Sequence, residues 1–66
     1  MNHRMIIKKW PGGIYGFSDD VGIPRRRVYS WTHRNHIPIK HWISVWRAAQ
    51  TKGLLHVTLE LIEAGQ

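Results

Sequence analysis

The stretch FSDDVGIPRRRVYSWTHR, residues 17–34, decides the fold of this chain. It predicts two short helices joined at Gly22, because a tight turn favours a residue that can adopt a positive φ. Ser18 is small enough to allow close contact between the two helices. Apolar residues stand where two helices that cross at a steep angle would touch, namely Phe17, Val21, Ile23, Val28 and Trp31.

The second of these helices has an apolar side and a polar side. Pro24 presets φ for a first helical position and keeps Ile23 extended, so the helix should begin at about Pro24. At about 100° per residue, the inner side holds Pro24, Val28 and Trp31, with Arg27 and Thr32 on the borders. The opposite side, which is free to bind a ligand, holds Arg25, Arg26, Tyr29, Ser30 and His33.

Three consecutive arginines, residues 25–27, occupy the first turn of this helix. The helix dipole disfavours cations there by roughly a few tenths of a kcal/mol each. A ligand would compensate for this cost, since guanidinium groups pair bidentately with phosphate or with the O6/N7 edge of guanine. A charge run that is merely solvated is the alternative, but the position after the turn and before Trp31 favours DNA.

The composition predicts one small domain without a secretory or membrane-spanning segment. The 66 residues suffice for one small domain, the four tryptophans supply its core, and no cysteine is present for disulfides or thiolate chemistry. The first ten residues are too short and too charged for a secretory segment, and no apolar run is long enough to span a membrane. We therefore expect a cytoplasmic, DNA-associated protein.

The positive charge is concentrated in the first part of the chain. Residues 1–52 carry a net charge of +8 and residues 53–66 carry −2, which gives the total of +6. Such a basic surface is typical of nucleic-acid binding, although an anionic membrane attracts the same charge. The acidic tail should face away from a polyanion.

Two helices are predicted before the turn. The first spans Arg4–Trp10, with Met5, Ile6 and Trp10 inward and with Arg4, Lys8 and Lys9 available to solvent or phosphate; residues 11–13, Pro-Gly-Gly, end it. The second spans Ile14–Val21 and is weakened by Gly16 at a cost of about 1 kcal/mol. Asp19 and Asp20 should be solvated or paired with nearby arginines.

A further helix should follow the arginine-bearing one. Asn35 suits a helix end and Pro38 forbids continuation, so the next helix is expected at Ile39–Lys52, closed by Gly53. Its broad apolar set predicts the chief core helix: Ile39, Trp42, Ile43, Val45, Trp46 and Ala49.

The tail, residues 55–66, is ambiguous. Leu55, Val57, Leu59 and Leu61 alternate as in a strand, yet Thr58 can cap a helix at 59–64 that Gly65 stops. The helix is favoured. Either version leaves more apolar residues than so small a body needs, and this surplus predicts that the tail takes part in a homodimer.

The chain carries the motifs WPGG, VGIP, VYSW and NHIP, followed by the expected helix at 42–49. Through these motifs, most of the chain resembles the phage Cro-type helix-turn-helix repressors. Pro24 replaces the usual Ser/Thr cap of the recognition helix, and Gly16 loosens the leading helix. The resemblance implies an all-α, compact four- to five-helix single domain in which Phe17, Ser18, Val21, Gly22, Ile23, Val28 and Trp31 form the core of the motif.

The resemblance also implies a sequence-specific transcriptional regulator, a repressor or autoregulator of a phage or mobile element. Two protomers would place their recognition helices in successive major grooves, roughly 34 Å apart, and bind an inverted repeat in double-stranded DNA. Base contacts are expected from Arg25, Arg26, Tyr29 and Ser30. Phosphate contacts are expected from Lys8, Lys9, Arg27, His33, Arg34 and Lys40.

Alternative functions follow from the same residues. Excisionase and MerR-like modules share a similar run, but there a β-hairpin wing follows where the expected helix at 39–52 lies. A membrane-surface protein is a second alternative, because Lys and Trp mixtures favour interfaces. A basic protein-interaction module built on a DNA-binding fold is a third.

Enzyme and metal chemistry find little support in the sequence. His33, His36 and His41 lack cysteines or carboxylates nearby that would complete a zinc site. No nucleophile with a paired base and no phosphate-cradling glycine loop is apparent. We expect neither an enzyme nor a bound cofactor, metal or small-molecule ligand.

Overall fold

The computed structural model describes residues 1–65 and contains helices but no strand in that range. The elements are α1 (His3–Lys8), α2 (Gly13–Val21), α3 (Arg25–Arg34), the short 3-10 helix η1 (Ile39–His41), α4 (Trp42–Lys52) and α5 (Leu59–Ala64). The all-α prediction is confirmed. The tail adopts its helical version, since the Thr58 hydroxyl accepts a hydrogen bond from the Leu61 amide at 3.1 Å. Gln66, the end of the predicted dimerisation tail, lies outside the described residues.

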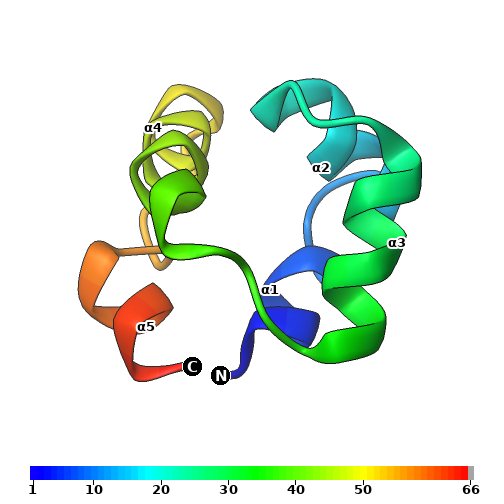
Figure 1. Ribbon diagram of the computed structural model, residues 1–66. Coiled ribbons are helices and arrows are strands. Elements are labelled where there is room, and N and C mark those ends of the chain that lie inside the picture. Colours follow the sequence, from blue (N-terminus) through cyan, green and yellow to red (C-terminus); the bar gives the residue numbers. More distant parts are fainter. Residues whose placement is uncertain (66) are drawn as a thin grey trace.

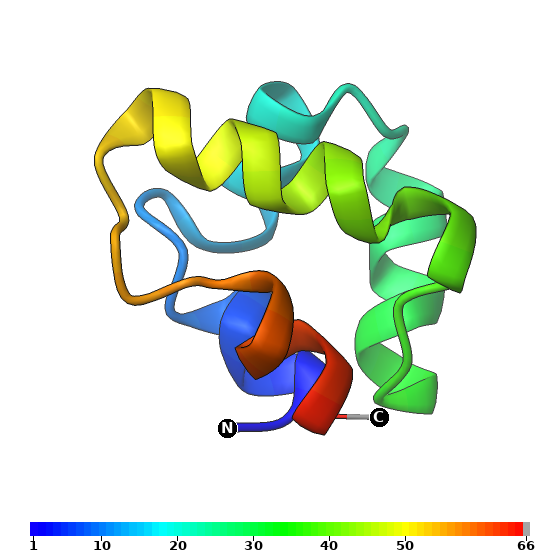
Figure 2. The same ribbon diagram turned by 90° about the vertical axis from the view of Figure 1, so that its left-hand side faces the viewer.

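The helices form two groups around one core (Figures 1 and 2). α3 packs against α1 and α2, while α4 packs against α2 and α5. The linker after α3 crosses from the first group to the second, and the two ends of the described chain lie side by side (Figure 1). The core that they enclose is built from Ile6, Ile7, Trp10, Phe17, Val28, Trp31, Ile37, Val45, Ala49, Val57 and Ile62.

The turn between α2 and α3 has the predicted form. Gly22 adopts φ 80°, and the amides of Gly22 and Ile23 both donate to the carbonyl oxygen of Ser18, at 2.9 and 3.1 Å. The buried Ser18 hydroxyl donates to the carbonyl oxygen of Ile23 and so closes the turn. Phe17 is buried beside Ser18, whereas Val21 and Ile23 pack at the margin of the core.

α3 begins one residue later than the proline pattern predicts. Pro24 has φ −54° and ψ 139°, so it is the residue before the helix and its ring is exposed rather than inward. Val28 and Trp31 are buried as predicted. Thr32, placed on the border of the wheel, is also buried, and its hydroxyl is satisfied by donating to the Val28 carbonyl at 2.9 Å.

α1 is shorter than predicted and rotated about its axis. It spans His3–Lys8 with Asn2 as its cap, and Ile7 rather than Met5 points into the core. His3 is fully buried and joins distant parts of the chain. Its Nδ1 accepts from the Ile37 amide at 2.8 Å, so its Nε2 donates to the Ile62 carbonyl at 2.6 Å. A buried polar side chain therefore ties both ends of the chain to the linker after α3.

Gly16 has a structural reason that helix propensity does not reveal. A Cβ at this position would overlap the carbonyl oxygen of Pro11, which lies in the turn between α1 and α2. The propensity cost of a glycine inside α2 is therefore accepted because the preceding turn approaches the helix closely. Gly16 therefore allows this turn to pack tightly against α2. The contact is not visible in the sequence, from which Gly16 was expected only to loosen the helix.

The predicted helix at 39–52 divides into η1 and α4, and its buried side is narrower than expected. Val45 and Ala49 are buried, and Trp42 and Trp46 are half-buried against the core. Ile39 and Ile43 were predicted inward, but they are 66% and 54% exposed. The prediction was wrong because the apolar arc is wider than the surface that the other helices present to it.

Candidate nucleic-acid interface

The candidate interface is the exposed side of α3, which α1 and α2 hold from behind. The side chains of Val28, Trp31 and Thr32 fix the orientation of the helix because they are buried. The seven remaining residues are exposed, and none is acidic or aliphatic: Arg25, Arg26, Arg27, Tyr29, Ser30, His33 and Arg34. All four predicted base-contacting residues, together with Arg27, His33 and Arg34, thus share one accessible surface.

Arg4 fixes the C-terminal end of this helix. Its backbone amide donates to Asn35 Oδ1 at 2.8 Å, and its guanidinium donates to the carbonyl oxygens of Thr32 at 2.9 Å and His33 at 3.2 Å. These are carbonyl groups at a helix end, where a cation is also favoured by the dipole. Arg4, which was expected to face solvent or phosphate, is therefore a capping residue of α3.

Arg25 does not extend freely from the first turn of α3. Its guanidinium carbon lies 4.0 Å from the ring centroid of Tyr15 in α2, which is a cation–π contact. A hydrogen bond with the neighbouring Tyr15 hydroxyl raises the pKa of Tyr29 above its ordinary value. Tyr15 and Tyr29 are 52% and 50% exposed, so two aromatic rings are accessible beside the arginine.

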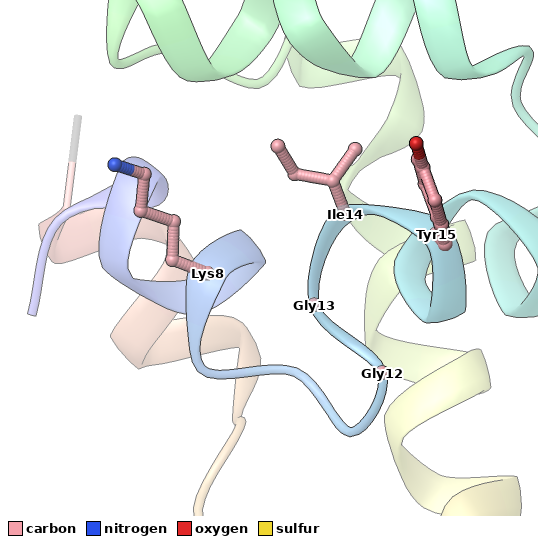
Figure 3. Close-up of a pocket in the computed structure, with 5 residues that line it drawn as sticks. All are labelled: Lys8, Gly12, Gly13, Ile14 and Tyr15. Carbon is pink, nitrogen blue, oxygen red and sulfur yellow. The ribbon is translucent and has the colours of Figure 1, made fainter.

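Two open hollows adjoin this aromatic group on the side of α1 and α2. One has a volume of about 380 Å³ and is lined by Lys8, Gly12, Gly13, Ile14 and Tyr15, and in it the side chains of Lys8, Ile14 and Tyr15 all extend toward α3 (Figure 3). The other, of about 400 Å³, also includes Lys8 and Ile14 and reaches Tyr29 and His33. Lys8 therefore belongs to the surface around α3, and its phosphate contact stays a prediction.

A third hollow lies on the opposite side of α3, where η1 faces it. Its volume is about 330 Å³, and Arg27, Ser30 and Arg34 of α3 line it together with Lys40 and His41 of η1. Burial lowers the pKa of His41, and the positive charges of Lys40 and Arg27 lower it further. Lys40 is thus brought to the same surface as the arginines of α3.

Lys9 is the predicted phosphate residue that the fold places elsewhere. It borders a small crevice formed with Trp10, Leu54, His56 and Val57, on the side of the chain that leads into the tail. Lys8 and Lys9 are adjacent in sequence, yet the helix directs them to different sides. Lys9 is therefore removed from the candidate interface.

Asp20 pairs with residues other than the predicted arginines. One of its oxygens, Oδ2, accepts from the Trp10 indole at 2.8 Å and lies 2.9 Å from the Lys52 ammonium. The hydrogen bond from Trp10 and the neighbouring Lys52 hold the pKa of this carboxyl below its ordinary value. Asp20 thus ties the turn after α1 and the end of α4 to α2, and it does not pair with the arginines of α3.

Several residues of this surface were missed because their positions depend on packing. Tyr15 was not singled out, although an aromatic residue opposite Phe17 on the α2 wheel is a usable signal. The sequence pattern does not place His36 and His41 at a particular surface, and within residues 1–65 no group of His, Asp or Glu side chains is arranged to hold a metal ion. Their place beside Lys40 and Arg34 follows from the path of the linker.

Comparison of the chain with models of protein families, with curated proteins and with solved structures finds no match in any of the three. Among the described residues, no helix combines the length and apolar character that crossing a membrane requires. The surface around α3, with its geometry and its charge, is therefore the feature from which a function can be inferred.

Proposed function

We propose that this protein is a sequence-specific DNA-binding transcriptional regulator that inserts α3 into the major groove of double-stranded DNA. The observation that carries the proposal is the exposed side of α3, which consists entirely of cationic, hydroxyl and histidine side chains on a helix fixed by three buried residues. A rigid helix is the element that the major groove admits, and these side chains pair with base edges and phosphates.

Base contacts in this proposal come chiefly from the middle of the exposed side. Arg26 lies away from the neighbouring helices on the wheel and can bond bidentately to the O6 and N7 atoms of guanine, and Ser30 stands at the edge of the hollow that η1 borders. Tyr29 offers its ring to a thymine methyl group or its hydroxyl to a phosphate. Arg25 contacts the DNA together with Tyr15, because its guanidinium already lies over that ring.

Phosphate contacts come from both flanks of α3. Lys8 lies on the flank formed with α1 and α2, and Arg27, Arg34 and Lys40 line the hollow on the η1 flank. A helix in the major groove has a phosphate backbone on each side, so cations on both flanks match this geometry. If about six phosphates are neutralised, log K should fall against log salt with a slope near −5.

Two copies of the chain are proposed to bind an inverted repeat as a homodimer. Val57 and Ile62 of the tail are buried in the core of their own domain, but Leu55 is 72% exposed and remains available to a second copy. Sedimentation of the wild type, Leu55→Ser and Ile39→Ser, free and on DNA, tests the tail as the contact. We expect only Leu55→Ser to weaken dimerisation; a strictly monomeric wild type in both conditions would contradict the dimer.

The biological role that we propose follows the resemblance to Cro-type repressors. Occupancy of an operator near a promoter would block or reposition RNA polymerase, with autoregulation of a small operon as the simplest outcome. After α3 the described chain continues into η1 and α4, where a winged excisionase or MerR-like module has a hairpin. This helical continuation supports the Cro-like version over the winged one.

The proposal is tested by selecting random-sequence duplexes with the wild type, with Arg26→Ala/Ser30→Ala and with Arg47→Ala, at near-physiological salt. Arg47 is exposed on α4, so it controls for the loss of one positive charge. We expect one inverted repeat to be enriched by the wild type and by Arg47→Ala, and to be lost or relaxed in the double variant. Retention of DNA without any enriched sequence would contradict sequence-specific binding.

A further inference from the structure

The hollow between α3 and η1 is lined by several cationic side chains. Arg27, Ser30 and Arg34 of α3 line it, together with His36 of the linker and Lys40 and His41 of η1. No carboxylate is among the residues that line it. Three permanent cations around one concave surface repel one another, and an anion would remove that repulsion.

The form of the hollow suits a phosphate group that remains attached to a longer molecule. Its volume of about 330 Å³ equals that of roughly ten water molecules, which exceeds the volume of one bound ion. The hollow is open at the surface beside α3, so a chain of linked phosphates could pass through it. The donors available to the oxygens are guanidinium, ammonium, hydroxyl and imidazole groups, all of which bond to phosphate.

His41 is one of two histidines that line this hollow, and it is the one that belongs to η1. Its ring lies 5.0 Å from the ring of Trp31, which holds it in place and partly shields it from water. The charged groups that face it are Arg27 and Arg34 of α3 and Lys40 of its own element, with His36 of the linker as the other titratable group. The His36 ring in turn lies 5.8 Å from that of the buried His3.

We propose that this hollow binds a phosphate group and that His41 takes up a proton as the phosphate enters. In the complex proposed above, the ligand is a backbone phosphate of DNA beside the groove that α3 enters, so this part of the inference rests on the proposed function. Binding of a free oxyanion by the same residues does not depend on it.

The direction of the pH dependence follows from the electrostatics. In the free protein, burial and the adjacent Lys40 and Arg27 lower the pKa of His41 from its ordinary value of 6.5, so the ring is neutral at neutral pH. A bound anion favours the imidazolium form and raises this pKa. Binding therefore tightens as the pH falls below neutral, until it passes the lowered pKa of His41 in the free protein.

The test has one arm with a simple anion and one arm with DNA. In the first, the His41 ring is titrated by NMR with sulfate, which keeps its charge over this pH range, against sodium chloride at equal ionic strength. We expect sulfate to shift the His41 and Trp31 ring signals and to raise the pKa of His41. The ring of His56, which is exposed outside the hollow, serves as the control.

The second arm measures affinity for the enriched duplex at about pH 5.5 and about pH 7.5. We expect the wild type and His56→Gln to bind about fivefold more tightly at the lower pH, and His41→Gln to lose at least half of that gain. Equal pH dependence in His41→Gln and His56→Gln, or sulfate shifts no larger than those of chloride, would overturn the inference while sequence-specific binding stands. Sulfate binding without DNA binding would support the hollow as an oxyanion site and contradict the proposed function.

Discussion

The segments that begin at Pro24 and at Pro38 start with the same backbone conformation but expose different side chains. An Ile-Pro pair precedes α3 and another precedes η1, which leads directly into α4, and Pro24 and Pro38 have nearly identical dihedral angles, φ −54° and −56° with ψ 139° in both. In each case the amide three residues later donates to the proline carbonyl at 2.9 Å. The two segments thus begin alike, as local sequence dictates.

The difference lies in the residues that face solvent after each proline. The first segment exposes Arg25 and Tyr29, whereas the corresponding positions after Pro38 are Ile39 and Ile43, which are 66% and 54% exposed. The second segment adopts the same backbone conformation after its proline without any arginine. This conformation therefore does not require the three arginines of α3. Their presence, against the helix dipole, is better explained by a ligand than by the fold.

The largest expected effect concerns the close contact between α2, which supports α3, and the turn that precedes α2. Gly16→Ala should destabilise the domain by about 3 kcal/mol, because the added methyl group would overlap the Pro11 carbonyl oxygen and displace the turn before α2. Helix propensity alone predicts the opposite sign, a gain of about 1 kcal/mol. Thermal unfolding decides between them, with Ser44→Ala at an exposed position of α4 as the control. A more stable Gly16→Ala protein would refute the close approach.

A smaller effect separates the two sides of α4. Val45→Ala should cost about 2 kcal/mol because Val45 is fully buried, whereas Ile43→Ala should change the stability by less than about 0.5 kcal/mol. Chemical denaturation measures both free energies of unfolding. Equal losses in the two variants would mean that α4 buries the wider apolar arc that its sequence suggested, and that the contrast with α3 is mistaken.

The smallest effect concerns Asp20, which leaves α3 free of acidic partners by pairing elsewhere. The pKa of Asp20 is lowered from 3.8 by the hydrogen bond from Trp10 and by Lys52, so its contribution to stability is present above about pH 4 and is lost as the pH falls through the lowered value. Asp20→Asn should therefore flatten the acid side of the stability profile. NMR titration of the Asp20 carboxyl measures the shift directly, and an ordinary or raised value would contradict the pairing.

The extent to which sequence predicts this molecule depends on how local each cause is. The turn at Gly22, the end of α3 at Asn35 and the cap at Thr58 follow from residues close in the chain, and they were predicted. His3 and Arg4 were not, since their hydrogen-bond partners lie 28 or more residues away. The apolar arc of α4 was too broad to identify its buried side, whereas the narrower arc of α3 identified Val28 and Trp31 correctly.

Some residues of the candidate site also follow from local sequence, and others depend on packing. Its central residues, such as Arg26 and Ser30, follow from the helical period of one segment. Its flanks depend on how separate elements meet, so the contact of Arg25 with Tyr15 and the position of His41 were not predicted, and Lys9 was assigned to the wrong side. Sequence therefore identifies the helix that is free to bind, and packing determines which neighbours accompany it.

The most direct test of the account compares Arg26→Ala with Arg47→Ala in affinity for the duplex that the wild type enriches. Both residues are exposed arginines, one on α3 and one on α4, so the variants lose the same charge. We expect Arg26→Ala to weaken binding by about 1 to 3 kcal/mol and to relax specificity at one base pair, with Arg47→Ala close to the wild type. Equal losses in both variants, without a change in specificity, would show that only the total charge matters and would contradict the role assigned to α3.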